Sequence, residues 1–392
     1  MKFTITPSRL SGPVAPPPSK SQAHRYLIAA ALAGGGSTIR NLADSQDIRA
    51  TRRCLAALHA DGGGLPVFDC GESGSTLRFL IPIALARRGG GVFTGQGRLM
   101  ERPQRPYLDL FREKGVRCTQ ENGVLTAEGR LTPGIYRLPG DVSSQFVTGL
   151  LYALPLLEGD SEILLTSPLE SRGYVDMTLA ALAAFGVSVT EIPNGFRTPG
   201  GQRYRPRAVS IEADWSQAAF WYASMALGHP VEPQGLNPAS AQGDMCIVSY
   251  CQRLRQSGDA ALDVSGCPDL APPLAVIAAL RAEERTSLTG AARLRIKESD
   301  RLAAITRVLC AMGADVEEGP DFLRIRGRDS LAGGCTVDCC NDHRIAMMAA
   351  VAATRCREPV TLLGAECVAK SYPAFWDDYK SLGGQVYEYP GE

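Results

Sequence analysis

The sequence predicts an α/β protein made of two similar halves, each with three repeated units. A helix of small apolar residues recurs six times along the chain, and each time a strand-like stretch and a second, amphipathic helix follow it. In addition, 392 residues exceed what one hydrophobic core usually organises, and a 45% hydrophobic share is enough for a large core in each half.

The first helix of each unit is apolar nearly all round, so we expect it to be buried. These helices are predicted at residues 25–33, 77–86, 146–157, 218–227, 273–280 and 345–353. A polar loop precedes each of them, and the Ser, Asp and Asn side chains of such loops typically cap helix N-termini. If the units pack side by side, the N-termini point the same way and their N–H groups attract anions.

The second helix of each unit is predicted to stop at a glycine that caps it in the left-handed conformation. These glycines are Gly62, Gly115, Gly186, Gly258, Gly313 and Gly383. Successive glycines are 53, 71, 72, 55 and 70 residues apart, and those three apart in the series are separated by 196, 198 and 197 residues. This near-constant offset indicates two halves. Strands follow, with hairpin turns expected at Asn122-Gly123 and Asn194-Gly195.

The charge balance and the cysteines exclude several classes of function. Lys and Arg together number 41, as do Asp and Glu, and this balance argues against bulk binding to nucleic acid or to an anionic membrane. The sequence has no apolar run of about 18 residues and no secretory signal, so we expect a cytosolic protein. The 12 cysteines include no Cys-x-x-Cys pair and are expected to be reduced. The group Cys335, Cys339, Cys340 and His343 lacks the spacing of a zinc site, so no metal is expected.

Basic residues gather around the predicted starts of the helices. They are Lys20, Arg25, Arg78, Arg102, Lys297, Arg301, Arg344 and Lys370. A cation at a helix N-terminus opposes the helix dipole, so the set needs anions, supplied either by neighbouring Asp and Glu or by a ligand. Arginine binds carboxylate and phosphate in a bidentate manner, which favours ligands that carry both groups. Asp269, Glu298 and Asp342 lie among these cations and are placed for proton transfer. No nucleotide-binding glycine loop is present.

At these positions the sequence is similar to the EPSP synthase family, the 3-phosphoshikimate 1-carboxyvinyltransferases. The similarity extends along nearly the whole chain. The motifs that carry it are Pro18-Ser19-Lys20-Ser21-Gln22-Ala23-His24-Arg25, Gly74-Ser75-Thr76-Leu77-Arg78, Glu101-Arg102-Pro103, Gly140-Asp141-Val142-Ser143-Ser144-Gln145, Ser171-Arg172-Gly173-Tyr174, Pro268-Asp269, Lys297-Glu298-Ser299-Asp300-Arg301, Asn341-Asp342-His343-Arg344 and Lys370-Ser371-Tyr372-Pro373.

The resemblance implies the architecture and the reaction. It implies two domains, each an inside-out α/β barrel of three βαβαββ units, with the active site in the interdomain cleft. One domain would be residues 1–18 with 214–392, and the other residues 19–213. The implied reaction moves the enolpyruvyl group of phosphoenolpyruvate to the 5-hydroxyl of shikimate 3-phosphate and releases phosphate, by addition and elimination through a tetrahedral intermediate. It requires no cofactor, nucleic acid or membrane. We expect a cytoplasmic monomer, and the family is the target of glyphosate.

The resemblance also assigns roles to residues. The implied catalytic residues are Asp269, as base at the 5-hydroxyl, and Glu298 and Lys20, as proton carriers at the methylene. The shikimate 3-phosphate set is Lys20, Ser21, Arg25, Ser143, Ser144, Gln145, Ser171, Asp269 and Lys297. The phosphoenolpyruvate set is Lys20, Gly74, Arg102, Gln145, Arg301, Arg344 and Lys370. Asp342 and His343 are expected behind these residues, and His343 is expected to be structural.

Some positions depart from the family pattern, and two alternatives stay open. Glu72 and Ser75 stand where many members have Asn and Thr, and Arg293 lies near a position that is often Asn. A carboxylate at Glu72 is expected to weaken anion binding unless it points away. UDP-N-acetylglucosamine enolpyruvyl transferase is one alternative, although Gly95 to Arg105 lacks its reactive Cys and Lys20-Ser21 replaces its Lys-Asn. A non-catalytic protein that binds small anions is the other.

Overall fold

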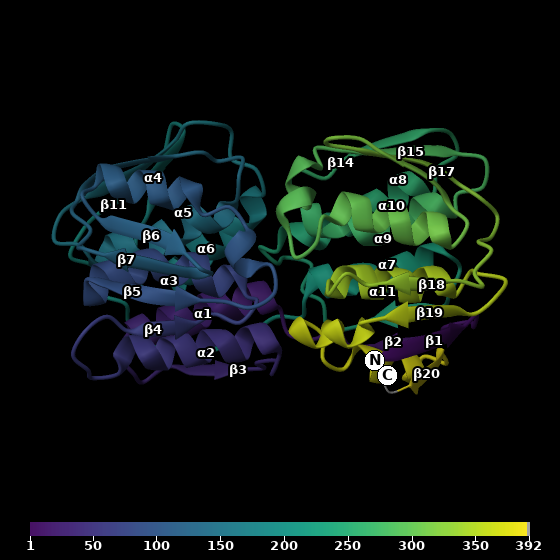
Figure 1. The fold of residues 1–392 in the computed structure, drawn as a ribbon, viewed down its shortest axis with the longest axis horizontal. Coiled ribbons are helices and arrows are strands. Elements are labelled where there is room, and N and C mark those ends of the chain that lie inside the picture. The colour runs from purple at the N-terminus through teal and green to yellow at the C-terminus, as the bar shows by residue number, and fades with distance from the viewer. Residues whose placement is uncertain (390–392) are drawn as a thin grey trace. The chain divides into compact units, whose positions relative to one another are not determined.

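The chain folds into two compact units, and each unit contains three of the repeats. In this computed structural model, which describes residues 1–389, the first unit is Met1–Ser19 with Ala213–Glu392 and the second is Lys20–Glu212 (Figure 1). Each of these bounds lies one residue from the corresponding expected domain limit. That the two units are separate folding domains stays a prediction.

Two repeats of the second unit have the complete predicted pattern. The first runs β4 (Val67–Asp69), α3 (Gly74–Arg88), β5 (Gly90–Thr94), α4 (Arg105–Glu113), β6 (Arg117–Glu121) and β7 (Val124–Glu128). The second runs β8 (Gly134–Leu138), α5 (Ser144–Ala153), β9 (Ser161–Leu165), α6 (Arg172–Ala184), β10 (Thr190–Ile192) and β11 (Gly195–Thr198). The sheet orders are β4-β5-β7-β6 and β8-β9-β11-β10. In both sheets the first pair is parallel and the last two strands form the predicted antiparallel hairpin.

The first unit also has two complete repeats. One runs β14 (Ala260–Asp263), α9 (Ala271–Ala279), β15 (Arg285–Thr289), α10 (Arg301–Ala311), β16 (Asp315–Glu318) and β17 (Leu323–Arg326). The other runs β18 (Thr336–Asp338), α11 (His343–Ala353), β19 (Val360–Leu363), α12 (Phe375–Ser381) and β20 (Gln385–Tyr389). The fourth strand of its sheet is β1 (Lys2–Thr6), which lies between β19 and β20. The beginning of the chain therefore completes a repeat formed by its end.

The remaining two repeats are reduced to two parallel strands each. In the second unit this repeat consists of α1 (Lys20–Leu32), β3 (Thr38–Arg40), α2 (Gln46–His59) and β12 (Ala208–Ser210), and β3 pairs with β12. In the first unit it consists of α7 (Trp215–Ala226), β13 (Val231–Pro233), α8 (Ile247–Leu254) and β2 (Gly12–Val14), and β13 pairs with β2. Both repeats lack the terminal hairpin among the described residues, so only four of the six have the full βαβαββ pattern.

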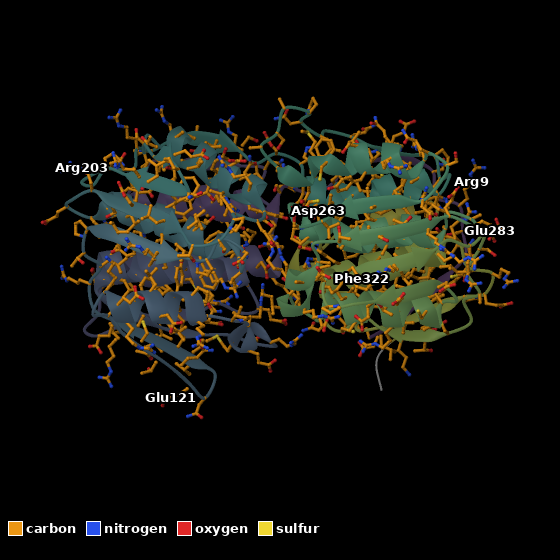
Figure 2. The ribbon with its side chains drawn as sticks, turned by 90° about the horizontal axis from the view of Figure 1, so that it is seen from above. Arg9, Glu121, Arg203, Asp263, Glu283 and Phe322 are labelled. Carbon is orange, nitrogen blue, oxygen red and sulfur yellow. The ribbon has the colours of Figure 1, made fainter. Side chains whose placement is uncertain are left out.

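The apolar helices form the cores of the two units, as predicted. All residues of α9 and α11 are buried, and so are eleven of the fifteen residues of α3. Charged side chains lie on the outside of each unit, among them Arg9 and Glu283 in the first and Glu121 and Arg203 in the second (Figure 2). None of the helices within residues 1–389 is long and apolar enough to span a membrane.

The predicted helix ends are confirmed at four of the six glycines. Gly115, Gly186, Gly313 and Gly383 take positive φ angles immediately after the residue that caps their helix. Gly258 has a φ of +90° but follows α8 at a distance, beyond its cap Arg255. The prediction for Gly62 is wrong, because α2 ends at Ala60 in an extended conformation and Gly62 is not left-handed.

His229 ties three segments of the first unit together. Its Nδ1 accepts the Leu10 N–H at 3.2 Å, so Nε2 carries the proton and donates to Thr354 Oγ1 at 2.8 Å. Thr354 in turn donates to the Val351 carbonyl at 2.7 Å. This network is complete only with a neutral imidazole. Burial, aided by Arg355 and Arg9, lowers the pKa of His229 to about 4.

We therefore expect the unfolding free energy to fall as the pH drops from 6.5 to 4. The unfolded imidazole binds a proton in this window and the folded one does not, so His229 stabilises the protein above pH 6.5 and loses this effect toward pH 4. The loss is on the order of 3 kcal/mol. Urea unfolding at several pH values in this window should show a shallower dependence for His229→Gln than for the wild type. Equal slopes would contradict this role of His229.

Candidate active site

In the first unit, five charged side chains surround Arg301, the first residue of α10. Its guanidinium donates to Asp342 at 2.8 Å, to Asp269 at 2.7 Å and to Glu298 at 2.7 Å. Its side chain is 1% exposed. Burial alone would lower the pKa of Arg301, but Asp342, Glu298 and Asp269 raise it well above its usual value. We call these four residues, with Lys297 and Arg344, the Arg301 cluster.

Within this cluster Asp269 forms ion pairs with three cations. Arg344 lies 2.9 Å from Oδ2, and Lys297 lies 3.6 Å from the other carboxylate oxygen. Burial would raise the pKa of Asp269, but Arg344, Lys297 and Arg301 hold it well below its usual value. Burial also lowers the pKa of Lys297 to about 8, an effect that Asp269 only partly offsets. Asp269 is thus an ionised carboxylate, and Lys297 is a cation that gives up its proton unusually easily.

The start of α11 supplies the other side of the cluster. Asp342 caps this helix through the Arg344 N–H at 3.0 Å and also accepts the Ser299 hydroxyl at 2.9 Å. The two preceding residues, Cys340 and Asn341, have positive φ angles of 55° and 51°, a conformation that side chains rarely adopt. The turn they form delivers the Asn341 carbonyl to Lys370 Nζ at 2.6 Å. Lys370 is thereby fixed beside the helix start.

Asp244 is a buried carboxyl group that the sequence analysis did not single out. It lies in the short helix Gly243–Cys246 and accepts a hydrogen bond from Ser216 of α7. Burial and the nearby charge of Asp269 raise its pKa to about 6. The only local signal was its place in a polar loop, Gln242-Gly243-Asp244, between two predicted helices.

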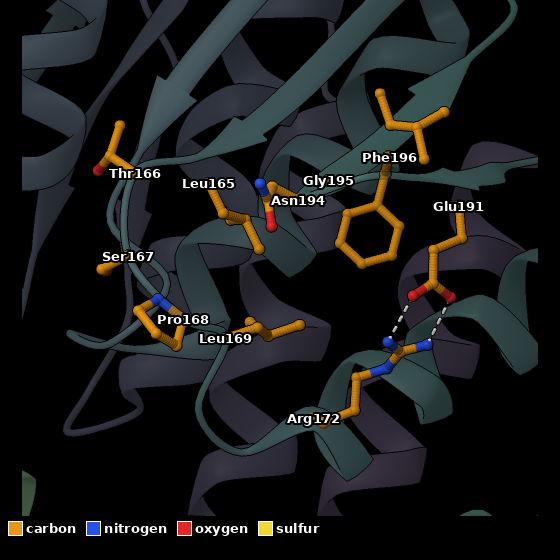
Figure 3. Close-up of a pocket in the computed structure, with 11 residues that line it drawn as sticks. Leu165, Thr166, Ser167, Pro168, Leu169, Arg172, Glu191, Asn194, Gly195 and Phe196 are labelled. Atoms are coloured by element: carbon orange, nitrogen blue, oxygen red, sulfur yellow. Dashed lines mark hydrogen bonds and ion pairs between the residues drawn. The ribbon is translucent and has the colours of Figure 1, made fainter.

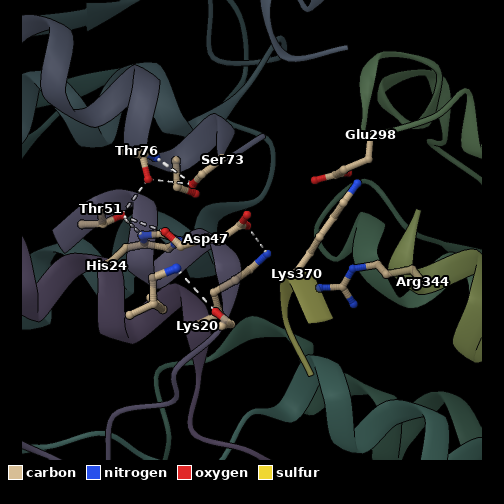
Figure 4. Close-up of polar contacts among 12 residues, drawn as sticks. Lys20, His24, Asp47, Thr51, Ser73, Thr76, Glu298, Arg344 and Lys370 are labelled. Atoms are coloured by element: carbon tan, nitrogen blue, oxygen red, sulfur yellow. Dashed lines mark hydrogen bonds and ion pairs between the residues drawn. The ribbon is translucent and has the colours of Figure 1, made fainter. Parts of the chain in front are cut away.

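In the second unit, Lys20 and Asp47 form an ion pair at the starts of α1 and α2. Lys20 Nζ lies 2.7 Å from Asp47 Oδ2, and the two side chains are 14% and 12% exposed (Figure 4). Asp47 was not predicted, because an acidic residue in the first turn of a helix is ordinary helix chemistry. The ion pair fixes the position of the Lys20 ammonium group.

Arg25 is a buried cation with neutral partners. Its guanidinium donates to Thr178 Oγ1 at 2.9 Å and to the carbonyls of Ser21 and Tyr174 at 2.6 and 2.7 Å. It also lies over the Phe79 ring at 5.3 Å. Within residues 1–389 it makes no ion pair with a carboxylate, and burial lowers its pKa to about 10. A desolvated charge with neutral partners favours binding of an anion.

Two further contacts order the predicted phosphoenolpyruvate residues of this unit. Arg78 Nη1 donates to Gln145 Oε1 at 2.8 Å, and this orients the Gln145 amide so that its Nε2 donates to Ser75 Oγ at 3.0 Å. A Cβ atom at Gly74 would lie 2.8 Å from Arg102 Nη1. Only glycine at this position lets the Arg102 guanidinium approach the start of α3 so closely.

The predicted serines lie at helix starts of the second unit. Ser143 caps α5 through the Gln145 N–H at 3.3 Å, and Ser144 is the first residue of that helix. Ser171 precedes α6 with a left-handed φ of 55°, and Ser21 lies in the first turn of α1.

The Glu72 side chain packs against Gly97, since a Cβ atom at Gly97 would lie 2.7 Å from Glu72 Oε2. Glu72 therefore covers the loop that leads to Arg102.

A hollow of about 470 Å³ lies elsewhere in the second unit, between the loop after β9 and the β10–β11 hairpin (Figure 3). The bidentate Arg172–Glu191 ion pair and the ring of Phe196 line it. None of the sequence-predicted site residues lines this hollow. It is therefore separate from the polar clusters described above.

The structure thus groups the predicted residues by unit. Asp269, Lys297, Glu298, Arg301 and Arg344 join in the Arg301 cluster, with Lys370 at the neighbouring turn. The other predicted residues belong to the second unit. Lys20, Ser21, Gly74, Ser143, Ser144, Gln145 and Ser171 lie at helix starts, Arg25 lies in the second turn of α1, and Arg102 follows the short helix Leu99–Glu101 with its guanidinium against Gly74. The described residues include no group of three or more His, Cys, Asp or Glu arranged to hold a metal ion, and all 12 cysteines are free thiols.

Comparison of the fold places the molecule in a class of enzymes. An enolpyruvyl transferase from Streptomyces tendae superposes with a TM-score of 0.75 over 98% of both chains, at 18% identity. The EPSP synthase of Acinetobacter baumannii superposes with a TM-score of 0.78 over 99% of this chain and 100% of that one, at 25% identity. The fold is that of the enolpyruvyl transferases.

The sequence comparison narrows the class to one family. The family model for EPSP synthase (3-phosphoshikimate 1-carboxyvinyltransferase) matches residues 5–63 and 64–379. The 3-phosphoshikimate 1-carboxyvinyltransferase of Clostridium kluyveri is 44% identical over 99% of both chains, and that of Clostridium acetobutylicum is 43% identical over 98% of both. The chain belongs to the EPSP synthase family of transferases.

Proposed function

We propose that this protein transfers the enolpyruvyl group of phosphoenolpyruvate to the 5-hydroxyl of shikimate 3-phosphate and releases phosphate. The observation that carries the proposal is the Arg301 cluster, in which two carboxylates with candidate catalytic roles, Asp269 and Glu298, are held on one buried guanidinium. Membership of the EPSP synthase family supports the choice of substrates.

Residues of both units bind the two anionic substrates. Arg25 and the serines Ser21, Ser143, Ser144 and Ser171 bind shikimate 3-phosphate, together with Lys20, Gln145, Asp269 and Lys297. Arg102, Arg301, Arg344 and Lys370 bind phosphoenolpyruvate, together with Lys20, Gly74 and Gln145. Guanidinium groups match both the carboxylate and the phosphate of this substrate. The reaction requires no cofactor, and we take one copy of the chain, in the cytoplasm, as the working unit of the shikimate pathway.

Asp269 becomes a base when the substrates bind. Arg344, Lys297 and Arg301 hold the pKa of Asp269 well below its usual value. Anionic substrates that bind these cations reduce their effect on Asp269, and its pKa rises toward the range in which it accepts a proton. Asp269 then takes the proton of the 5-hydroxyl as the oxygen attacks the central carbon of phosphoenolpyruvate.

The proton balance of the two steps uses the remaining candidates. In the addition, Glu298 or Lys20 gives a proton to the methylene carbon, and the tetrahedral intermediate forms. In the elimination, the same group removes a proton from the new methyl, the carbon–oxygen bond to phosphate breaks, and the enolpyruvyl double bond forms. The leaving phosphate accepts the proton that Asp269 took from the 5-hydroxyl, so all catalytic groups return to their initial states.

Phosphate release from phosphoenolpyruvate tests the proposal directly. With the wild-type protein we expect phosphate only when shikimate 3-phosphate is present, with one equivalent of enolpyruvyl product for each phosphate. Turnover with UDP-N-acetylglucosamine in place of shikimate 3-phosphate would assign the protein to the other enolpyruvyl transferases. Binding of both anions without phosphate release would identify a non-catalytic protein.

A further inference from the structure

Four buried polar side chains form a chain of hydrogen bonds beside the start of α3. His24 Nδ1 lies 2.7 Å from Thr51 Oγ1, which lies 2.6 Å from Thr76 Oγ1, and Thr76 donates to Ser73 Oγ at 2.7 Å (Figure 4). His24, Thr51 and Thr76 lie in α1, α2 and α3, and Ser73 is the N-cap of α3. None of the four is more than 1% exposed. The family motifs quoted above include His24 and Thr76 but neither Thr51 nor Ser73.

The hydroxyl protons fix the direction of this chain. Each hydroxyl carries one proton, and Thr76 donates its proton to Ser73. Thr51 Oγ1 also lies 3.3 Å from the Asp47 carbonyl, but its bond to Thr76 is much shorter, at 2.6 Å, so the Thr51 proton is assigned to Thr76. Thr51 in turn has none left for His24, so the imidazole donates its Nδ1 proton to Thr51. The donors run from His24 through Thr51 and Thr76 to Ser73.

A neutral His24 keeps this direction. Burial, with the nearby charges of Lys20 and Arg25, holds the pKa of His24 well below its usual value. The imidazole therefore has a single proton, which the network places on Nδ1. Its Nε2 is buried and has no hydrogen-bond partner within residues 1–389, as expected for the nitrogen that carries no proton.

The hydroxyl proton of Ser73 takes no part in this chain of hydrogen bonds. Ser73 Oγ accepts both the Thr76 hydroxyl and the Thr76 N–H, the latter at 3.2 Å, so its own proton points elsewhere. Among residues 1–389 no acceptor receives it. Ser73 caps α3 directly before Gly74, against which the Arg102 guanidinium lies. A buried donor without an acceptor favours an acceptor that binds there from solution.

We propose that the Ser73 hydroxyl is a further binding group for phosphoenolpyruvate and donates to an oxyanion of this substrate at the start of α3. His24, Thr51 and Thr76 are positioning residues, because they occupy the acceptor sites toward which Ser73 could otherwise turn. This assignment rests on the proposed function, since it extends the set formed by Gly74 and Arg102.

Steady-state kinetics of Ser73 variants test the assignment. We expect Ser73→Ala to raise the KM for phosphoenolpyruvate about tenfold or more, the effect of one hydrogen bond to a charged group, and to leave the KM for shikimate 3-phosphate unchanged. Ser73→Thr retains the hydroxyl and should restore the wild-type KM. Ser45→Ala is the matched control, because buried Ser45 likewise caps α2 through a backbone N–H. It should lower the Tm without changing either KM.

Two measurements test the direction of the chain separately. Thr51→Val should raise the KM for phosphoenolpyruvate while Thr51→Ser does not. In the wild-type protein, ¹⁵N NMR should show the His24 proton on Nδ1, and a proton on Nε2 would overturn the derived direction even if Ser73→Ala does not fold. An active wild type whose phosphoenolpyruvate KM is the same in Ser73→Ala would overturn the inference alone. A wild type without turnover would overturn the proposed function instead.

Discussion

Replacement of Glu298 by glutamine is expected to lower kcat by about two to four orders of magnitude, the range that general acid–base groups supply. Glutamine has nearly the same shape and keeps an oxygen that can accept from Arg301, as Glu298 does at 2.7 Å. It cannot exchange a proton at neutral pH. Because the change removes chemistry and not binding, the dissociation constant for shikimate 3-phosphate, measured by calorimetry, should stay close to that of the wild type.

Glu318→Gln is the matched control for this variant. Glu318 belongs to the same unit and also pairs with an arginine, lying 3.5 Å from Arg295. Its replacement should change neither kcat nor substrate binding. Full activity of Glu298→Gln would reject the proposed acid–base role, whereas equal losses of activity in both variants would attribute the effect to loss of charge in this unit.

Replacement of Arg25 by alanine should weaken shikimate 3-phosphate binding by about a hundredfold, as expected for a charge-assisted contact of about 3 kcal/mol. The reason is that Arg25 is a desolvated cation with only neutral partners. Its pKa of about 10 leaves it fully charged at pH 7. Calorimetry with shikimate 3-phosphate alone isolates this effect from phosphoenolpyruvate binding and from turnover.

Arg88 offers a control with similar contacts in the same unit. Its Nη1 donates to the carbonyls of Leu58 and Ala60, both at 2.8 Å, so Arg88→Ala also removes an arginine bonded to backbone oxygens. We expect it to reduce stability and to leave shikimate 3-phosphate binding unchanged. An unchanged dissociation constant in Arg25→Ala would contradict the assignment of Arg25 to this substrate.

Much of the fold could be predicted because its repeats carry regular signals. The six apolar helices follow from composition alone, since a helix without a polar face has to be buried. The spacing of the glycines also reflects which repeats lack the terminal hairpin. The two short intervals, 53 and 55 residues, follow Gly62 and Gly258, which end the repeats of α2 and α8. Those are the two repeats without a terminal hairpin, and the missing residues account for the difference from 70–72.

The role of β1 could not be predicted from such local signals. Its five residues read as an ordinary strand at the beginning of the chain, yet they pair with β19 and β20. Strand pairing across more than 350 residues leaves no trace in periodicity, because it depends on how the whole unit closes. The prediction at Gly62 failed for the opposite reason. The local signal was strong, but α2 is already capped at Ala60, which has an extended conformation.

The candidate site was predictable as a set of charges but not as a network. Arginine and lysine at helix starts are conspicuous, because they oppose the helix dipole. Asp47, Thr51 and Asp244 are of residue types that are common in caps and helix surfaces, and only their partners give them a role. Those partners lie between 25 and 28 residues away in sequence, so the contacts appear only once the repeats are packed.

A crystal structure with shikimate 3-phosphate and a phosphoenolpyruvate analogue tests the central claim most directly, namely that the helix starts of both units serve one pair of anionic substrates. The account predicts that Lys20, Arg102 and Arg344 contact the same analogue molecule and that Asp269 contacts the 5-hydroxyl of shikimate 3-phosphate. Analogue bound by residues of only one unit, or Asp269 remote from that hydroxyl, would contradict it.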